Sequence, residues 1–314
     1  MKFDKKNQNH LKSEGKFSFP YNGENAERYL KMLEPYQPFV HDIFLSLPNI
    51  PDFFSGYLHK SGYYEKCKNF LELVKDRKEI KTVITLNGNY SRMPYTEKQK
   101  FIEIVIRQIN NYNIYGAVVS DFTMAEMLHN NLPNLVLNTS CNVPQYKVSH
   151  LNHWKKYAGV EIINVTRDSS FDFKLLKEFK EAGYKIKLLL NEQCHYKCPN
   201  ICSFCNLSSG ELSFDCTNKK YNESPFQTCT IIPRWLDKYD DLVDIYKITG
   251  RYMSSEHIFN TLEHYINRDD YDIQIGDRFI NTSLFPDKLL YCGHMNCDVC
   301  KECDKVISKI DLTN

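Results

Sequence analysis

Short apolar, β-rich runs alternate with amphipathic segments along most of this chain. Such alternation is typical of repeated β/α units, because each strand needs a helix to cover it. The pattern predicts eight strands, at Asp42–Leu47, Thr82–Asn87, Gly116–Ser120, Leu135–Thr139, Val160–Val165, Ile186–Leu190, Thr228–Ile232 and Ile245–Ile248.

Helices are predicted between the strands. Thr96–Asn110 places apolar side chains such as Phe101 and Ile109 on one helical face, and Phe122–Asn130 and Asp172–Ala182 behave likewise. A glycine after the last of them, Gly183, is a typical helix stop. These segments supply the helical half of a β/α alternation.

Eight strands in this rhythm predict an α/β fold, a TIM-like (β/α)8 barrel with a cysteine-rich C-terminal extension. The second candidate is an open doubly wound sheet, but no Gly-rich phosphate loop follows any strand. We expect a polar tail over 1–16, a barrel domain over 17–266 with a cysteine-rich insertion at 194–229, and an extension over 267–314.

Composition adds few constraints. The formal net charge is +1, so nothing global attracts nucleic acid or membranes, although a local basic face would suffice for RNA. No run of about eighteen apolar residues predicts a membrane span. The polar, lysine-rich stretch Met1–Lys16 has no secretory character, so we expect a cytoplasmic protein with reduced thiols.

Ten of the twelve cysteines follow residue 193. Clustered thiolates at spacings of two to four residues suit zinc or iron–sulfur clusters, and reduced thiols favour metal over disulfides. The candidate metal ligands form two groups, Cys194, Cys198, Cys202, Cys205, Cys216 and Cys229, then Cys292, Cys297, Cys300 and Cys303.

The first group allows a radical SAM interpretation. Cys198, Cys202 and Cys205 have the three-thiol spacing of that family's cluster motif, with the aromatic Phe204 before the last cysteine. However, the motif normally follows the first strand of its barrel, and here it follows about the sixth.

Polar residues also recur where predicted strands end, which is where barrels carry their chemistry. They are Asn87, Asn89, Ser120, Asp121, the run 138–142, the run 166–168, Asn191, Glu192 and Arg251. Arg251 follows Gly250 just past the last strand, and its planar fork suits a carboxylate or phosphate. Lys247 lies in that strand. We take Asn191, Glu192, Lys247 and Arg251 as candidate catalytic residues.

Several segments resemble the collagenase-like peptidase family U thirty-two (U32) between about residues 17 and 265. Asn191–Pro199 is similar to its Asn-Glu-x-Cys-x3-Cys-Pro signature, and Asp244–Arg251 resembles its Phe-Lys-x-x-Gly-Arg signature. Weaker matches are Phe17–Asn22, Asp42–Pro48, Ile114–Asp121 and Leu137–Ser140.

This resemblance implies a TIM-like barrel and a [4Fe-4S] cluster held by four cysteines. It also implies an oxygen-independent oxidation or hydroxylation of a nucleobase, a quinone-like ring or a small biosynthetic intermediate. By residue matching, Cys194 and Cys198 take the first two ligand positions and Cys229 the last. Cys216 fits the third by order, while Cys202 and Cys205 are extra thiols.

Several alternatives stay open. The C-terminal cysteines can hold zinc or a second iron–sulfur cluster. A protease, as the family name suggests, would need a cysteine paired with a base such as His195 or His153. A zinc-stapled binding protein without catalysis is a further alternative. Expected partners are a small-molecule or RNA substrate and an electron donor or partner subunit.

Overall fold

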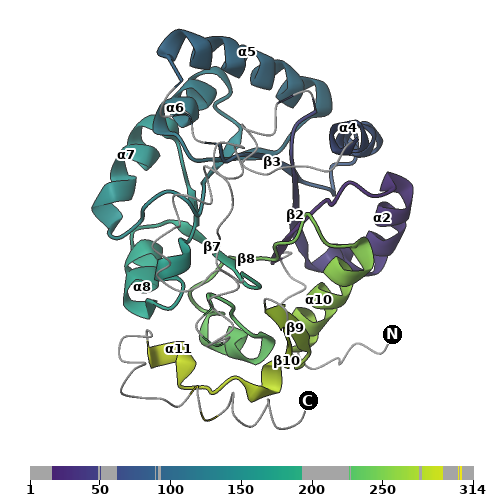
Figure 1. Cartoon of the computed structure of the whole chain (residues 1–314). Coiled ribbons are helices and arrows are strands. Elements are labelled where there is room, and N and C mark those ends of the chain that lie inside the picture. Colours follow the sequence, from purple (N-terminus) through teal and green to yellow (C-terminus); the bar gives the residue numbers. More distant parts are fainter. Residues whose placement is uncertain are drawn as a thin grey trace.

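The computed structural model describes residues 16–48, 50, 62–88, 90, 93–192, 226, 228–275, 278–292, 303 and 305. Eight parallel strands close into a barrel in chain order, and the first strand pairs with the eighth (Figure 1). They are β1 Phe17–Pro20, β2 Val40–Leu45, β3 Thr82–Leu86, β4 Gly116–Val119, β5 Val136–Thr139, β6 Ile162–Asn164, β7 Lys185–Leu189 and β8 Ile245–Lys247. The TIM-like barrel prediction is confirmed.

Helices surround the barrel between consecutive strands (Figure 1). They are α2 Ala26–Leu33, α4 Tyr63–Val74, α5 Tyr95–Tyr112, α6 Phe122–Asn131, α7 Val148–Ala158, α8 Phe173–Glu181 and α10 Ser255–Asn267, with 3-10 turns η1 Glu34–Phe39, η2 Arg167–Ser169 and η4 Pro233–Lys238. Side chains of Asn25, Asp121, Asp172 and Ser254 cap α2, α6, α8 and α10. Such caps satisfy amide groups that the first helical turn leaves unpaired.

One predicted barrel strand is wrong and one barrel strand was missed. The segment Thr228–Ile232 is not a barrel strand; its Ile231 amide donates to the Leu190 carbonyl at 2.7 Å, past the end of β7. The missing strand is β1, which is only four residues long and buried at every position. Strands buried on both faces lack alternation, so periodicity does not mark such a short one.

The packed shell between strands and helices is apolar and aromatic. Tyr21 stacks on Phe70 at 4.3 Å between ring centroids, and Tyr29 meets Phe70 and Phe259 at 5.8 and 5.1 Å. Inside the barrel the apolar cluster is small, comprising Phe44, Val83 and Val118 with Tyr115 beside it. Polar side chains such as Asp42, Asn138 and Lys187 are buried at other interior positions.

The C-terminal part packs outside the ring, near β8 and α10 (Figure 1). It contains an antiparallel pair that the sequence pattern did not predict, β9 Asp272–Ile275 and β10 Arg278–Asn281, then η5 Thr282–Leu284 and α11 Leu289–Cys292. Arg234 of η4 anchors it, donating to the Asp270 carboxylate at 2.8 Å and the Thr282 carbonyl at 2.7 Å. Among the described helices, none is long and apolar enough to cross a membrane.

Candidate functional site

A hydrogen-bonded ion pair lies at the centre of the barrel. The Lys187 ammonium of β7 donates to Asp42 of β2 at 2.6 Å, and the Ser18 hydroxyl of β1 donates to the other Asp42 oxygen at 2.5 Å. His41 contacts the same carboxylate through Nδ1 at 2.7 Å. Strand register explains the meeting, because Ser18 lies opposite Asp42 and inward positions alternate along each strand.

The charges of this pair are mutually stabilised. Burial alone would raise the pKa of the Asp42 carboxyl, but the Lys187 ammonium and the His41 ring outweigh burial and lower that pKa well below its ordinary value. Both side chains of the pair are only 1 % exposed. Asp42 is therefore a carboxylate whose negative charge is already balanced, and we assign the pair to the barrel's architecture.

Lys247 of β8 lies in the same interior, and no carboxylate in the described part of the chain pairs with it. Its ammonium is 4.3 Å from the centroid of the Phe44 ring, and the residue is 6 % exposed. Burial is the main cause that lowers the pKa of Lys247 to about 8, and the charges of Lys187 and Arg251 act in the same direction. Cys141 and Asp42 act against the lowering.

The predicted site residue Glu192 lies at the carboxyl end of β7, in a rim network. Arg167 of η2 pairs with the Glu192 carboxylate at 3.1 Å through Nε and donates to the Asn142 side chain at 3.1 Å. These three residues follow strands β6, β7 and β5, so the fold brings together polar positions that sequence reasoning selected one by one. Arg167 holds the Glu192 side chain in place at the rim.

Asn191 joins the ends of two strands. Its side-chain oxygen accepts from the Thr249 amide at 2.7 Å, and its nitrogen donates to the Thr249 carbonyl at 3.1 Å. This reciprocal pair fixes the β7 end against the chain that follows β8. The contact gives Asn191 a positioning role, and its predicted catalytic role stays a prediction.

Arg251 reaches across the barrel from beyond β8. Its NH1 donates to the Ser46 and Thr85 hydroxyls at 2.9 and 3.0 Å, which lie after β2 and in β3. Gly250 has a φ of +124°, which favours glycine at this turn. The predicted anion clamp stays a prediction, with the guanidinium located over the interior that contains Lys247.

Of the six cysteines predicted for the first metal site, the structure describes only Cys229. It is 1 % exposed, and the next residue, Thr230, donates to the Glu192 carbonyl at 3.0 Å. The chain thus enters and leaves the cysteine-rich segment at the same strand end.

Cys194, Cys198, Cys202, Cys205 and Cys216 lie outside the described residues, as do Cys297, Cys300 and Asn89. Cys292 ends α11, with only its backbone described, and Cys303 is partly buried against the core. No group of three or more His, Cys, Asp or Glu among the described residues has metal-site geometry.

A pocket of about 290 Å³ opens beside Asn191 and Thr230. Its other walls come from the β8–α10 loop, from α10 and from β9, and include Tyr252, His257 and Tyr271. It lies at the rim where the Thr230 hydroxyl donates to the Glu192 carbonyl. Its position makes it the candidate substrate pocket of this rim.

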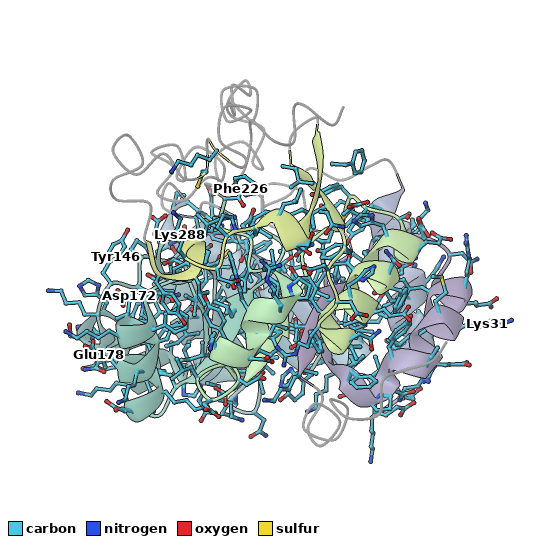
Figure 2. All side chains as sticks on the ribbon, turned by 90° about the horizontal axis from the view of Figure 1, so that it is seen from below. Lys31, Tyr146, Asp172, Glu178, Phe226 and Lys288 are labelled. Carbon is cyan, nitrogen blue, oxygen red and sulfur yellow. The ribbon has the colours of Figure 1, made fainter. Side chains whose placement is uncertain are left out.

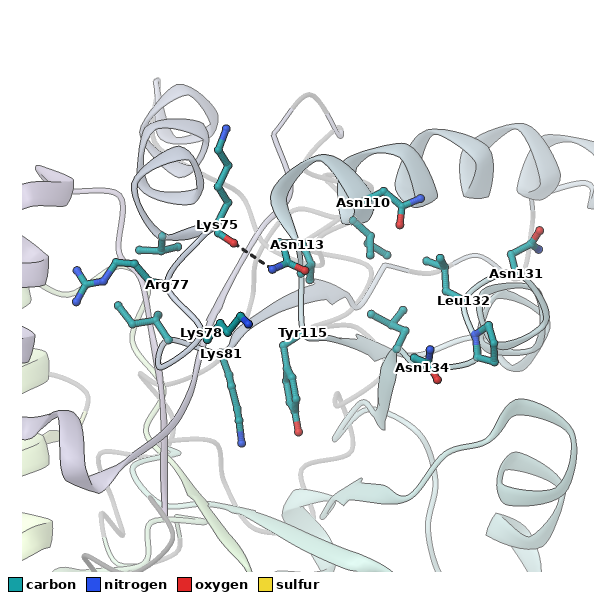
Figure 3. A pocket seen from close by; sticks show the side chains of 16 residues that line it. Lys75, Arg77, Lys78, Lys81, Asn110, Asn113, Tyr115, Asn131, Leu132 and Asn134 are labelled. Carbon is teal, nitrogen blue, oxygen red and sulfur yellow. Dashed lines mark hydrogen bonds between the residues drawn. The ribbon is translucent and has the colours of Figure 1, made fainter.

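A larger pocket, of about 520 Å³, lies where strands β3, β4 and β5 begin (Figure 3). Its cations are largely engaged elsewhere: Lys75 pairs with Glu72 at 2.7 Å, and Arg77, which points away in Figure 3, pairs with Glu79 at 2.9 Å. Barrel enzymes carry their chemistry at the opposite end. We therefore do not assign this pocket to the site.

Two of the other polar positions predicted at strand ends make local structural contacts. Asp121 caps α6 and pairs with Lys98 at 2.7 Å, while the Ser120 hydroxyl donates to the Gly88 carbonyl at 2.8 Å. Sequence reasoning missed Ser18, Asp42 and Lys187. The available signal was a lysine inside the apolar run at 186–190, which is unusual for a buried strand.

The upper side of the molecule in Figure 2 is the end at which the strands finish. Tyr146, which follows β5, is labelled there, as is Phe226, whereas Glu178 of α8 lies lower. The Phe226 ring packs edge-on against Phe285 at 4.9 Å between centroids. The chain that returns from the cysteine-rich segment is thus packed against the C-terminal part at this end.

Comparisons with known proteins agree with this architecture. A curated relative from Methanocaldococcus jannaschii, called uncharacterized protease MJ1657, is 26 % identical over 247 residues, which is 72 % of this chain and 71 % of the relative. The solved structure of the U32 peptidase Mk0906 superposes with a TM-score of 0.56 at 13 % identity, covering 80 % of this chain and 96 % of that one.

No family model matches the sequence. The sequence relationship to the archaeal protein and the barrel shared with the U32 peptidase stand beside the signature segments at 191–199 and 244–251. The chain is therefore similar in sequence to the archaeal protein and shares its barrel fold with the U32 peptidase Mk0906.

Proposed function

We propose that the protein is an iron–sulfur enzyme that oxidises or hydroxylates a nucleobase, a quinone-like ring or a small biosynthetic intermediate without molecular oxygen. The observation that carries the proposal is the position of Cys229, buried beside the strand end from which the signature Asn191–Pro199 continues. Thiolates at 194, 198 and 229, with Cys216 as the fourth by order, suit a [4Fe-4S] cluster.

The described residues fit such a group. Cys229 is buried among apolar residues such as Ile231 and Ile232, a setting that limits solvent access to an iron–sulfur site. The hydrogen bond from Thr230 to Glu192 holds the two ends of the cysteine-rich segment together. When bound, the cluster would supply one-electron chemistry at the rim.

The chain's own residues would bind and orient the substrate. The pocket beside Asn191 presents the rings of Tyr252 and Tyr271 together with His257, which suits a flat polar molecule. Arg251 would attract an anionic group, and the Arg167–Glu192 pair would place a carboxylate at the same rim.

Metal analysis tests the proposal. Cys194→Ala, Cys198→Ala and Cys229→Ala should each lose iron and acid-labile sulfide after anaerobic purification, with the broad absorption near about 400 nm. Cys67→Ala, which removes a buried thiol on α4, is the matched control and should keep both. Full iron content in all three variants would refute the assignment. Cleavage of S-adenosylmethionine with dithionite would instead favour the radical SAM alternative.

We propose a separate metal site for Cys292, Cys297, Cys300 and Cys303, of zinc or iron–sulfur type. Cys297→Ala should lower the metal content without removing the absorption of the first site. Loss of both together would show that the two cysteine groups form one site.

A protease is the second candidate, because the curated relative is called one. The predicted base His153 lies exposed on α7, with its ring 5.6 Å from that of Tyr157, and His195 lies outside the described residues. Cleavage of a gelatin or casein substrate that survives Cys194→Ala but not His195→Ala would favour this candidate over the redox enzyme.

A further inference from the structure

Two lysines lie on neighbouring strands inside the barrel, and they differ in their partners. Lys187 is bound to Asp42 at 2.6 Å. Lys247 is 94 % buried, yet among the residues that the structure describes no carboxylate pairs with it and no acceptor receives a hydrogen bond from it; its one contact of this kind is the Phe44 ring. Burying an ammonium without a paired anion costs folding free energy, which suggests that Lys247 has a functional role.

The surroundings favour the neutral amine. Burial disfavours the charged ammonium most, and the positive charges of Lys187 and Arg251 oppose a further positive charge nearby. Cys141 and Asp42 are the titratable groups that act in the opposite direction, and the pKa of Lys247 is lowered to about 8. Near neutral pH the nucleophilic free amine is then on the order of a hundredfold more abundant at Lys247 than at an exposed lysine.

Hydrogen-bond acceptors are available on the same interior surface. The side-chain oxygens of Asn138 in β5 and Asn164 in β6 are buried and, within the described part of the chain, have no hydrogen-bond partner. Register places Asn164 opposite Lys187 and Lys247 opposite Ser18, so these side chains share the inner face of the barrel. Unsatisfied buried acceptors are rare and suit a ligand that brings a hydroxyl or N–H group.

We propose that Lys247 is a catalytic residue that forms an imine with an aldehyde or ketone substrate in the barrel interior. The free amine nitrogen attacks the carbonyl carbon, and the C=O electron pair moves to oxygen, which takes up the proton that nitrogen loses. The hydroxyl group of the resulting carbinolamine can donate a hydrogen bond to the side-chain oxygen of Asn138 or Asn164. A second proton, taken from solvent, lets that hydroxyl leave as water while the nitrogen lone pair forms the C=N bond; the imine formed is protonated and can return this proton to solvent.

The net change is condensation of one amine with one carbonyl and release of one water, without an oxidant or reductant. The protonated imine then withdraws electrons from the adjacent carbon, which favours removal of a proton there. This activity goes beyond the proposed iron–sulfur chemistry and does not require the cluster.

Reductive trapping tests the proposal. The whole protein, purified anaerobically, is incubated with propionaldehyde near neutral pH and reduced with sodium borohydride, and the modified lysines are found by peptide mass spectrometry. We expect Lys247 to be modified faster than the exposed Lys78 by on the order of tenfold or more. This ratio is smaller than the difference in free-amine abundance because the barrel interior restricts access of the aldehyde to Lys247. Lys247→Arg should keep the thermal midpoint and lose the adduct.

If Lys78 is labelled while Lys247 is unlabelled, or is labelled no faster than Lys78, modification follows solvent exposure alone. That result would overturn the proposal that Lys247 forms an imine. The iron content of the same sample is measured in parallel. Iron present with Lys247 unlabelled refutes the imine alone, whereas Lys247 labelled in a protein that never binds iron refutes the iron–sulfur function alone.

Discussion

The barrel has two buried regions that differ in composition. The shell between strands and helices is built from apolar and aromatic side chains, such as the stacked Tyr21 and Phe70. The barrel interior holds Asp42 and two lysines around a small apolar cluster. The shell gains stability from area removed from water, whereas each interior charge costs free energy unless it is paired. The difference indicates that the shell stabilises the fold through buried apolar area, whereas the interior keeps charged side chains whose cost is offset at the Asp42–Lys187 pair.

The largest expected effect comes from Asp42→Asn. It leaves the Lys187 ammonium buried without its anion, so we expect the free energy of unfolding to fall by about 4 kcal/mol. Because the pKa of Asp42 is lowered in the folded state, its contribution is present above the ordinary carboxyl pKa of about 4 and is lost as the pH falls below it. Urea denaturation as a function of pH measures both.

The shell offers the comparison for that variant. Phe70→Ala should cost a similar 3–5 kcal/mol, roughly independent of pH, because it removes only packing. Adding Lys187→Met to Asp42→Asn should recover most of the lost stability. If the double variant were as unstable as Asp42→Asn, the loss would not come from an unpaired charge.

The next effect has the opposite sign. Lys247→Met removes an unpaired buried charge, so we expect the free energy of unfolding near pH 7 to rise by up to about 3 kcal/mol. The folded pKa of about 8 lies below the ordinary 10.5, so the unfolded chain binds more protons between these values and the parent gains stability there as the pH rises.

The advantage of Lys247→Met should therefore shrink between about pH 8 and about pH 10.5, and parallel denaturant titrations would measure it. Lys78→Met, on the surface, is the control and should show no such trend. A destabilised Lys247→Met would mean that Lys247 is paired in solution.

Asn191→Ala tests whether the rim residue positions or catalyses. Removing the reciprocal bonds to Thr249 should lower the free energy of unfolding by about 2 kcal/mol. Thr230→Val removes one hydrogen bond at the same rim and should cost about 1 kcal/mol. Thermal denaturation compares them; unchanged stability in Asn191→Ala together with lost turnover would assign it to catalysis.

The smallest effect belongs to the opposite end of the barrel. Lys78→Ala, in the pocket before β3, should change stability by less than about 0.5 kcal/mol and leave the iron content unchanged. Denaturation and metal analysis of this variant set the baseline for the rim variants. A loss of iron there would show that the cluster site is not confined to the rim.

The sequence by itself determined the fold class, seven of the barrel strands and the main helices. Runs such as 82–86 and 116–119 are recognisable because local periodicity and burial agree there. It also selected Lys247, Arg251, Asn191 and Glu192 from their place at strand ends and in two signatures.

Only the tertiary structure decided which of these residues meet. β1 is too short for its pattern to be read, and Ser18, Asp42 and Lys187 come together only when β1, β2 and β7 close the ring. Among the described residues, Asp42 pairs with Lys187 and no carboxylate pairs with Lys247, a difference that depends on where Asp42 lies across the barrel. Long-range pairing of this kind has no local signal, because strand closure, and not neighbouring residues, places these charges.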